Sequence, residues 1–197
     1  AKQMIYVILF FIYFLFDMNY FIRGIWTFIR SYINFIRKPI SPFETSVHYD
    51  TCFFTDLDLW FHMNNARYLR EADFGRIKFL VESGIGKALY SLGGSFTNGG
   101  NNIRYRKSIN LFDRYRIETK VLYWDDKAFY LEQQFIRDSD KFVCAVNVMR
   151  LSIMNSSTSQ VLEKLGCRDA IRPEPLPELV KWMEAAQLSS DRLKKAS

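Results

Sequence analysis

The chain begins with an uninterrupted apolar run. Residues 4–16 read MIYVILFFIYFLF, with no side chain more polar than tyrosine. A helix of that length reaches only about 20 Å, against roughly 30 Å for the hydrocarbon core of a bilayer, but continuing it through Asp17 to Ile22 gives a sufficient length. We therefore expect a membrane-anchoring helix over residues 1–22. The alternatives are a cleaved signal peptide, for which no small-x-small cleavage site follows the run, and a buried core helix.

After this run the pattern becomes periodic. Arg23, Arg30 and Arg37 recur every seven residues, so on a helix they form one stripe together with Thr27 and Asn34. The rest of the circumference is aliphatic or aromatic: Ile25, Trp26, Phe28, Ile29, Ile33 and Ile36. This pattern is typical of a helix that lies in the headgroup plane of a membrane. The alternative is a helix that packs on its own domain.

Two prolines, Pro39 and Pro42, end this pattern, so residues 23–42 are interpreted as a basic amphipathic helix and a linker. A folded domain is predicted from residue 43 to residue 157. It opens with a β-branched and aromatic strand at residues 44–54. A long helix then starts at Asn64 or Asn65 and closes at Gly84. Its charged side chains are expected mostly on the side away from the core: Arg70, Glu71, Asp73, Arg76, Lys78 and Glu82.

The second half of the domain reads as a meander of strands. A short apolar piece and a glycine-rich loop over residues 93–100 come first, and four strand-like runs follow them at residues 102–107, 115–124, 128–137 and 142–153. Strand, long helix and four antiparallel strands make an α+β fold, since no βαβ alternation occurs. Residues 158–197 are predicted to be a C-terminal extension with a short helix and a charged tail.

Charge and cysteine usage narrow the class of protein. The net charge is +6, and much of the excess lies in the amphipathic segment, which favours a membrane surface over nucleic acid as partner. Basic residues follow the apolar run, so the domain is expected in the cytosol, with the endoplasmic reticulum as the default membrane. A secretory route, with the N-terminal segment as signal, is the alternative, and the sequon at Asn155 would serve only there.

Cys52, Cys144 and Cys167 lack metal-ligand spacing, so we expect reduced thiols, no metal and no cofactor.

The richest polar cluster precedes the long helix. Asp58 and His62 lie close in sequence to the backbone amides of Asn64 and Asn65, which a helix N-terminus leaves free. Hydrolysis at an acyl carbonyl needs a carboxylate that attacks the carbonyl or activates water, and donors for the developing oxyanion. Asp58 is the natural carboxylate and His62 its orienting partner. Asp56 is the weaker candidate.

The same segment resembles the pattern D-x-D-x-x-G-H-[VM]-N-N-x-x-Y of the 4-hydroxybenzoyl-CoA thioesterase-like family in the hotdog superfamily. The matching residues are Asp56, Asp58, His62, Met63, Asn64, Asn65 and Tyr68. With LREADF, WDDKAFYLE and FVCA, the chain looks closest to the group called thioesterase superfamily member six. Two positions depart from what the resemblance leads one to expect. Phe61 precedes the histidine where glycine or glutamine is usual, and Trp60 stands at the position that corresponds to the catalytic asparagine of plant acyl-carrier-protein thioesterases.

The resemblance implies a hotdog fold, in which an antiparallel sheet wraps a central helix, and a homodimer. It implies that Asp58 and His62 are catalytic and that Asn64, Asn65 and Tyr68 bind the substrate or its oxyanion. The strand NIRYRKS, where related enzymes carry a further acid or cysteine, offers cations for the phosphates of an acyl carrier: Arg104, Arg106 and Lys107.

Two functions remain open at this level. The first is a membrane-attached thioesterase-like protein that binds long-chain acyl-CoA or another acyl thioester and hydrolyses it, with residues 1–38 on the membrane. The second is a protein without turnover that serves as an acyl-CoA sensor or a scaffold in membrane lipid metabolism.

Overall fold

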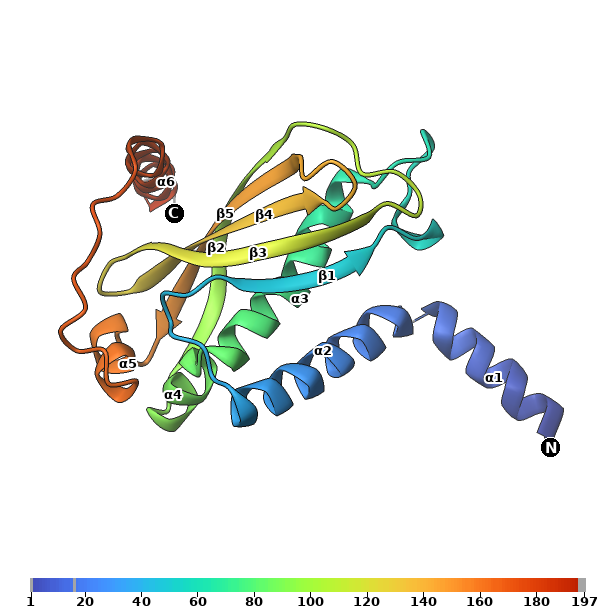
Figure 1. Cartoon of the computed structure of the whole chain (residues 1–197), viewed down its shortest axis with the longest axis horizontal. Coiled ribbons are helices and arrows are strands. Elements are labelled where there is room, and N and C mark those ends of the chain that lie inside the picture. The colour runs from blue at the N-terminus through green and yellow to red at the C-terminus, as the bar shows by residue number, and fades with distance from the viewer. Residues whose placement is uncertain (1, 16, 195–197) are drawn as a thin grey trace.

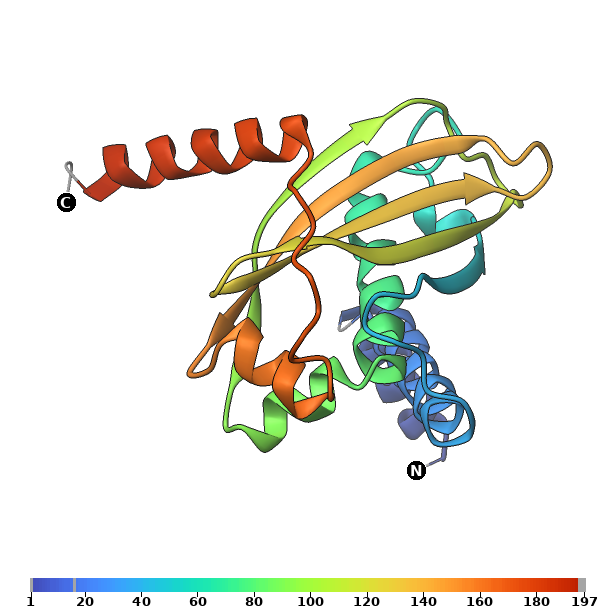
Figure 2. The ribbon, with the colours of Figure 1, turned by 60° about the vertical axis from the view of Figure 1, so that its left-hand side comes forward.

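The computed structural model describes residues 2–15 and 17–194. Its helices and strands are, in chain order, α1 (Lys2–Leu15), α2 (Met18–Arg37), β1 (Ser46–Thr51), the 3-10 turn η1 (Phe54–Asp56), α3 (Asn65–Glu82), α4 (Ile85–Ser91), β2 (Ser95–Tyr105), β3 (Arg114–Trp124), β4 (Ala128–Arg137), β5 (Val143–Met154), α5 (Thr158–Lys164) and α6 (Pro177–Lys194). The strands form one antiparallel sheet in the order β1-β3-β4-β5-β2. The sheet curves around α3, which lies along its inner face (Figures 1 and 2).

The core lies between α3 and the inner face of the sheet. Gly75 faces the sheet in the middle of α3, and a Cβ there would lie 3.0 Å from Ile117 and 3.1 Å from the Thr119 hydroxyl. The missing side chain therefore lets helix and sheet approach closely. Buried apolar side chains fill the space on both sides of this contact, among them Phe79, Leu131, Phe135 and Met149.

The predicted α+β architecture is confirmed, and several element bounds agree closely with the sequence pattern. The strand predicted at residues 128–137 is β4 itself. The one predicted at 115–124 differs from β3 by one residue at its start, and the one predicted at 142–153 differs from β5 by one residue at each end. The glycine-rich loop is confirmed at Gly93 and Gly94 and was a wrong prediction from Ser95 onward, where β2 begins. Gly99 and Gly100 lie within β2, at a bulge where its register against β5 shifts.

The expected single helix through Asp17 to Ile22 is also wrong. Asp17 has a left-handed backbone, with φ 45°, and it separates α1 from α2. Figure 1 shows the two helices meeting at an angle, and Asp17 between them is ion-paired with Arg70 of α3 at 3.0 Å. No helix within residues 2–15 and 17–194 is long and apolar enough to cross a membrane.

Helix α2 packs on its own domain, which was the alternative interpretation of its pattern, and it does so through its polar side. Thr27 and Ser31 are buried against the domain, and Asn34 donates a hydrogen bond of 2.7 Å to Glu82 of α3. The apolar side faces outward. Nine large side chains there keep 42–65% of their surface exposed: Phe21, Ile22, Ile25, Trp26, Phe28, Ile29, Tyr32, Ile33 and Ile36.

The C-terminal extension also packs on the domain. Val161 and Leu162 of α5, a helix that the sequence analysis did not predict, lie in the main core cluster. Helix α6 is longer than expected and lies on the side of the sheet opposite α3 (Figure 2). Leu179 and Trp182 hold it against Tyr130 of β4, which explains why β4 is buried on both faces.

Candidate functional site

Asp58 and His62 are brought together by a tight turn ahead of α3. The Asp58 amide donates to the His62 carbonyl (3.0 Å) and the Phe61 amide donates to the Asp58 carbonyl (3.1 Å). This geometry leaves Oδ2 of Asp58 only 3.2 Å from Nδ1 of His62. The other oxygen, Oδ1, accepts from the amide of Trp60 at 2.9 Å. Both side chains are therefore fixed by the turn and not by the core.

The turn presents this pair to the outside. The side chain of Asp58 is 16% exposed and that of His62 is 33% exposed, so a substrate can reach both. Phe61 has a left-handed backbone, with φ 60°, which explains why the family pattern has glycine at this position. The neighbouring Leu59, Trp60 and Phe61 side chains are 74–88% exposed and form an apolar rim beside the pair.

The first turn of α3 begins immediately after the pair. Asn64 is its N-cap, and its Oδ1 accepts from the Ala66 amide at 2.9 Å. Asn65 is the first helical residue and is exposed; its amide is one of those that a helix leaves without an internal acceptor. The positive end of the helix dipole is thus open at Asn65, whereas the side-chain oxygen of Asn64 is already used.

Two of the polar residues of the cluster point into the protein. Asp56 is fully buried and accepts from the Phe53 amide at 2.9 Å, so it shapes the turn. Tyr68 is 2% exposed, and its hydroxyl accepts from the Ile109 amide at 3.3 Å. Burial raises the pKa of the Tyr68 phenol. The structure does not bring Tyr68 to the open side of the site, where the family pattern had suggested a substrate contact.

The three cations of the NIRYRKS segment lie at the end of β2, on the edge of the sheet. Arg106 donates to the Val143 carbonyl at 3.2 Å, and Lys107 lies 3.3 Å from Asp140. Arg104 makes no ion pair with any residue that the structure describes. Between them, Tyr105 donates a hydrogen bond of 2.8 Å to the Asn65 carbonyl. The cationic end of β2 is thereby tied to the first turn of α3.

Comparison with known proteins identifies the family. A family model described as the thioesterase-like superfamily matches residues 52–185. The chain belongs to this superfamily. It is similar to "Protein THEM6" of Drosophila melanogaster, at 40% identity over 190 residues that cover 96% of this chain and 97% of the relative. It is also similar to "Protein THEM6" of Xenopus laevis, at 44% identity over 72% of this chain and 69% of that one. The resemblance found in the sequence is confirmed.

Solved structures of this superfamily share the fold. YbaW, a probable thioesterase from Escherichia coli, superposes with a TM-score of 0.57 at 22% identity, covering 62% of this chain and 97% of its own. SAV2348 of Staphylococcus aureus, solved in complex with CoA, gives 0.56 at 16% identity, covering 70% of this chain and 92% of its own. The five-stranded sheet around α3 is therefore a hotdog fold.

A charge cluster that the sequence analysis missed lies behind this site. Glu71 of α3 is fully buried and is contacted by Arg23 of α2, with Nη1 to Oε1 at 3.1 Å. Arg23 also lies 2.5 Å from Asp50 of β1, and the Tyr115 hydroxyl donates to Glu71 at 3.3 Å. Glu71 was predicted to face away from the core. Its spacing from Tyr68 and Gly75, three and four residues, was the available signal that it shares their buried face.

The environment of Glu71 changes its acidity. Burial raises the pKa of this carboxyl from 4.5 to about 7, and the neighbouring Arg23 opposes the rise. Asp50 differs, because its partners His48 and Arg23 outweigh burial and lower its pKa. The cluster is enclosed by α2, α3, β1 and β3, so these groups hold the N-terminal helix on the domain and do not face a substrate.

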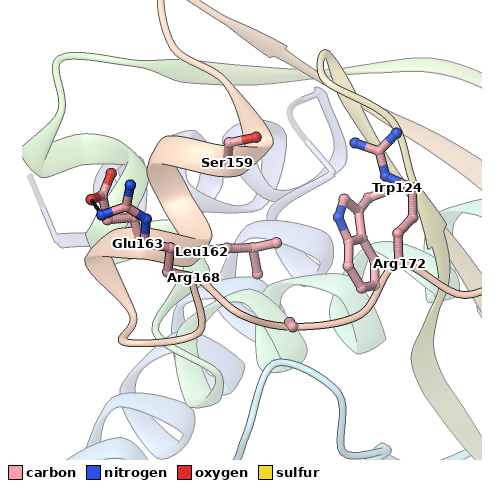
Figure 3. Close-up of a pocket in the computed structure, with 7 residues that line it drawn as sticks. Trp124, Ser159, Leu162, Glu163, Arg168 and Arg172 are labelled. Atoms are coloured by element: carbon pink, nitrogen blue, oxygen red, sulfur yellow. Dashed lines mark ion pairs between the residues drawn. The ribbon is translucent and has the colours of Figure 1, made fainter.

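The structure shows further cavities under the C-terminal segment. One of about 410 Å³ is lined by Trp124 and by residues of α5 and the following loop (Figure 3). Its two guanidinium groups both have acidic partners, Glu163 at 3.3 Å from Arg168 and Asp126 at 2.9 Å from Arg172. This cavity therefore offers no unpaired cation to an anionic ligand.

Among the described residues, no group of His, Cys, Asp and Glu side chains is placed to hold a metal ion.

Proposed function

We propose that the protein binds long-chain acyl-CoA and hydrolyses it to the free acid and CoA. The observation that carries the proposal is the partly exposed pair of Asp58 and His62, 3.2 Å apart, directly before the open N-terminus of α3. A carboxylate, an imidazole and free helix amides are the groups that thioester hydrolysis needs. Membership of the thioesterase-like superfamily supports the same chemistry.

The geometry suggests how the reaction proceeds. A thioester carbonyl oxygen placed at the Asn65 amide is polarised by that N–H and by the helix dipole. Asp58, oriented by His62, accepts a proton from a water molecule as the water oxygen attacks the carbonyl carbon. The carbon–sulfur bond then breaks, and the proton passes to the departing thiolate. Arg104, Arg106 and Lys107 would contact the carrier's phosphates.

Membrane attachment is a further part of the proposal. Helix α2 turns its apolar side away from the domain, so residues 1–38 are suited to immersion in one leaflet while the polar side carries the domain. We propose the endoplasmic reticulum as the membrane, with the domain in the cytosol. Protease treatment of microsomes tests this topology, because a domain that is shielded until detergent is added would contradict the cytosolic placement.

We also propose a homodimer. Strand β2 ends the sheet, so its outer edge is free to pair with a second copy, and the exposed apolar rim beside Asp58 would be covered by it. Light scattering of the detergent-solubilised chain should give the mass of two copies per particle, after subtraction of the detergent. A mass of one copy would contradict the dimer.

One observation favours the alternative function, an acyl-CoA sensor or scaffold without turnover. The apolar side chains of Trp60 and Phe61 are 76% and 74% exposed beside the pair, where the related pattern has glycine in the second position. In this alternative, the site retains the acyl thioester and the rim excludes the water that would hydrolyse it.

Hydrolysis of an acyl-CoA chain-length series by the full chain in detergent decides between the two. We expect Asp58→Asn to reduce kcat by at least a hundredfold while acyl-CoA still binds. Asp169→Asn, a matched change of an exposed carboxyl far from the turn in sequence, should leave the rate unchanged. Binding of every chain length without release of thiol by the unaltered protein would overturn the enzymatic proposal and leave the sensor.

A further inference from the structure

We propose that the cavity between the outer face of the sheet and α6 binds the adenosine bisphosphate part of CoA. The inference rests on the proposed function and makes it more specific, because it selects a nucleotide-bearing carrier over a carrier protein. It also assigns a role to the C-terminal extension, which supplies one wall of the cavity.

The cavity has a suitable size and is well supported. Its volume is about 360 Å³, within the range of roughly 300–1,000 Å³ that is usual for small-molecule sites. The sheet side includes Arg104 of β2 and Arg106, which directly follows that strand, and the helix side includes Glu178, Leu179 and Trp182 of α6. Leu179 is 3% exposed and Trp182 meets the Tyr130 ring edge-on at 6.2 Å between centroids, so α6 is held firmly against the sheet.

Charges in the cavity match those of a phosphorylated nucleoside. Arg104 has no ion-pair partner among the described residues, and the guanidinium of Arg106 lies over the Phe142 ring with a carbonyl as its hydrogen-bond acceptor. Both are therefore available to phosphate oxygens, which guanidinium groups bind in a bidentate manner. Of the two lining carboxylates, Glu132 is ion-paired with Lys120 at 3.2 Å.

The remaining groups suit the base. Glu178 offers acceptor oxygens, and the exocyclic amino group of adenine is a hydrogen-bond donor. Trp182 is partly exposed and presents an aromatic surface, on which a nucleobase can stack. Phosphate at the strand and adenine at α6 would together occupy both sides of the cavity.

The cavity is also connected to the hydrolytic site. Tyr105 lies between Arg104 and Arg106 on β2, and successive side chains of a strand point to opposite faces. Its hydroxyl reaches the Asn65 carbonyl at 2.8 Å on the inner side. A nucleotide on the outer face and a thioester at Asn65 are thus separated by a single edge strand. The pantetheine arm would pass the end of that strand, beyond Tyr105, which leaves the outer edge of β2 to the second copy.

Titration calorimetry on the full chain in detergent tests the inference, with CoA, adenosine 3′,5′-bisphosphate and pantetheine as probes. We expect CoA to bind at least tenfold more tightly than pantetheine, and the bisphosphate to compete with CoA. Arg104→Glu should weaken CoA and bisphosphate binding at least tenfold and leave pantetheine binding unchanged. Lys181→Glu, the same charge change at an exposed position of α6 that does not line the cavity, should have no effect.

Two substitutions of Trp182 distinguish the loss of base stacking from a loss of α6 packing. Trp182→Leu should weaken bisphosphate binding, and Trp182→Phe should restore most of it. The inference is overturned if the bisphosphate does not bind, or if Arg104→Glu and Lys181→Glu weaken CoA binding equally. If the protein binds the nucleotide but does not hydrolyse acyl-CoA, the cavity inference is supported and the proposed enzymatic activity is contradicted. The failure of one proposal can therefore be distinguished from the failure of the other.

Discussion

Arg23 of α2 contacts Glu71 in the middle of α3, with Nη1 and Oε1 3.1 Å apart. This contact joins a helix whose sequence reads as a membrane segment to the central helix of a hotdog domain. Asp50 of β1 completes the arrangement, because Nη2 of Arg23 contacts both Asp50 and Glu71. The polar side of α2 is therefore part of the folded interior, and several consequences can be measured.

Removing the guanidinium should destabilise the protein strongly. Arg23→Ala removes the cation that pairs with Asp50 and that opposes the rise in the pKa of Glu71, and breaking a buried pair in this way costs about 3–5 kcal/mol. Chemical denaturation followed by circular dichroism measures the loss. Arg30→Ala, which removes an exposed arginine from the same helix, is the control and should leave the free energy of unfolding unchanged. Equal effects of the two changes would contradict the role given to Arg23.

Stability should depend on pH through Glu71. Its pKa is about 7 in the folded protein and 4.5 as the ordinary value, so the folded state binds more protons than the unfolded state between these limits. The contribution of Glu71 to stability is therefore largest below pH 4.5 and falls as the pH rises to 7. Denaturation of the native chain and of Glu71→Gln over this range should differ in slope. Parallel curves would show that Glu71 titrates normally.

The left-handed turn at Phe61 predicts a stabilising substitution. The left-handed conformation at Phe61 costs a residue with a Cβ about 1–2 kcal/mol, and Phe61→Gly removes this cost. Part of the resulting gain in stability is lost, because glycine has greater conformational freedom in the unfolded chain. Phe61→Ala removes the same ring and keeps the Cβ, so it should be the less stable variant by about 1 kcal/mol. Thermal unfolding of the two, compared directly, tests the assignment.

At Gly75, where α3 approaches the sheet closely, a substitution that favours helices should destabilise the fold. Alanine is the better helix former by about 1 kcal/mol, yet its Cβ would lie 3.0 Å from Ile117 and 3.1 Å from Thr119. We expect Gly75→Ala to destabilise the fold by about 1–3 kcal/mol through overpacking. A gain in the free energy of unfolding would mean that α3 has room to move away from the sheet.

The exposed apolar side of α2 should bind lipid. Replacing Ile25 and Ile29 with serine removes apolar surface that a leaflet would cover, and we expect the affinity for phospholipid vesicles to fall on the order of tenfold or more. Ile171→Ser is the control, because Ile171 is 92% exposed on the loop before α6. Vesicle flotation gives the bound fraction. An unchanged fraction for the double variant would contradict membrane contact through this side of α2.

Sequence patterns predicted the strands well because period-two alternation identifies a strand with one buried face, and Asn64 marked the start of α3 as an N-cap. Gly99 and Gly100 were misplaced because glycine favours turns, whereas here it forms a bulge inside β2. The Asp58 and His62 contact was predictable from sequence proximity. The buried position of Tyr68 was not predictable, since helical spacing does not distinguish an aromatic side chain in the core from one that faces a substrate.

The orientation of α2 could not have been predicted from its own sequence. An amphipathic pattern defines two sides of a helix but not which of them meets the rest of the chain. The outcome depended on Glu71 and Glu82, which lie far along the chain and supply acceptors for Arg23 and Asn34. Charged residues in a helix are usually assigned to solvent, and that assumption concealed both acceptors.

The inward polar side of α2 also determines where the chain can be shortened. A recombinant protein that begins at residue 43 retains every strand of the sheet but lacks the guanidinium that Glu71 and Asp50 require. It would expose a charged groove along α3, and a loss of activity in it would reflect a damaged fold and not a missing membrane. Versions intended for crystallisation should instead keep α2 from Met18 onward and replace exposed apolar residues on its outer side, because those residues contribute least to the folded unit.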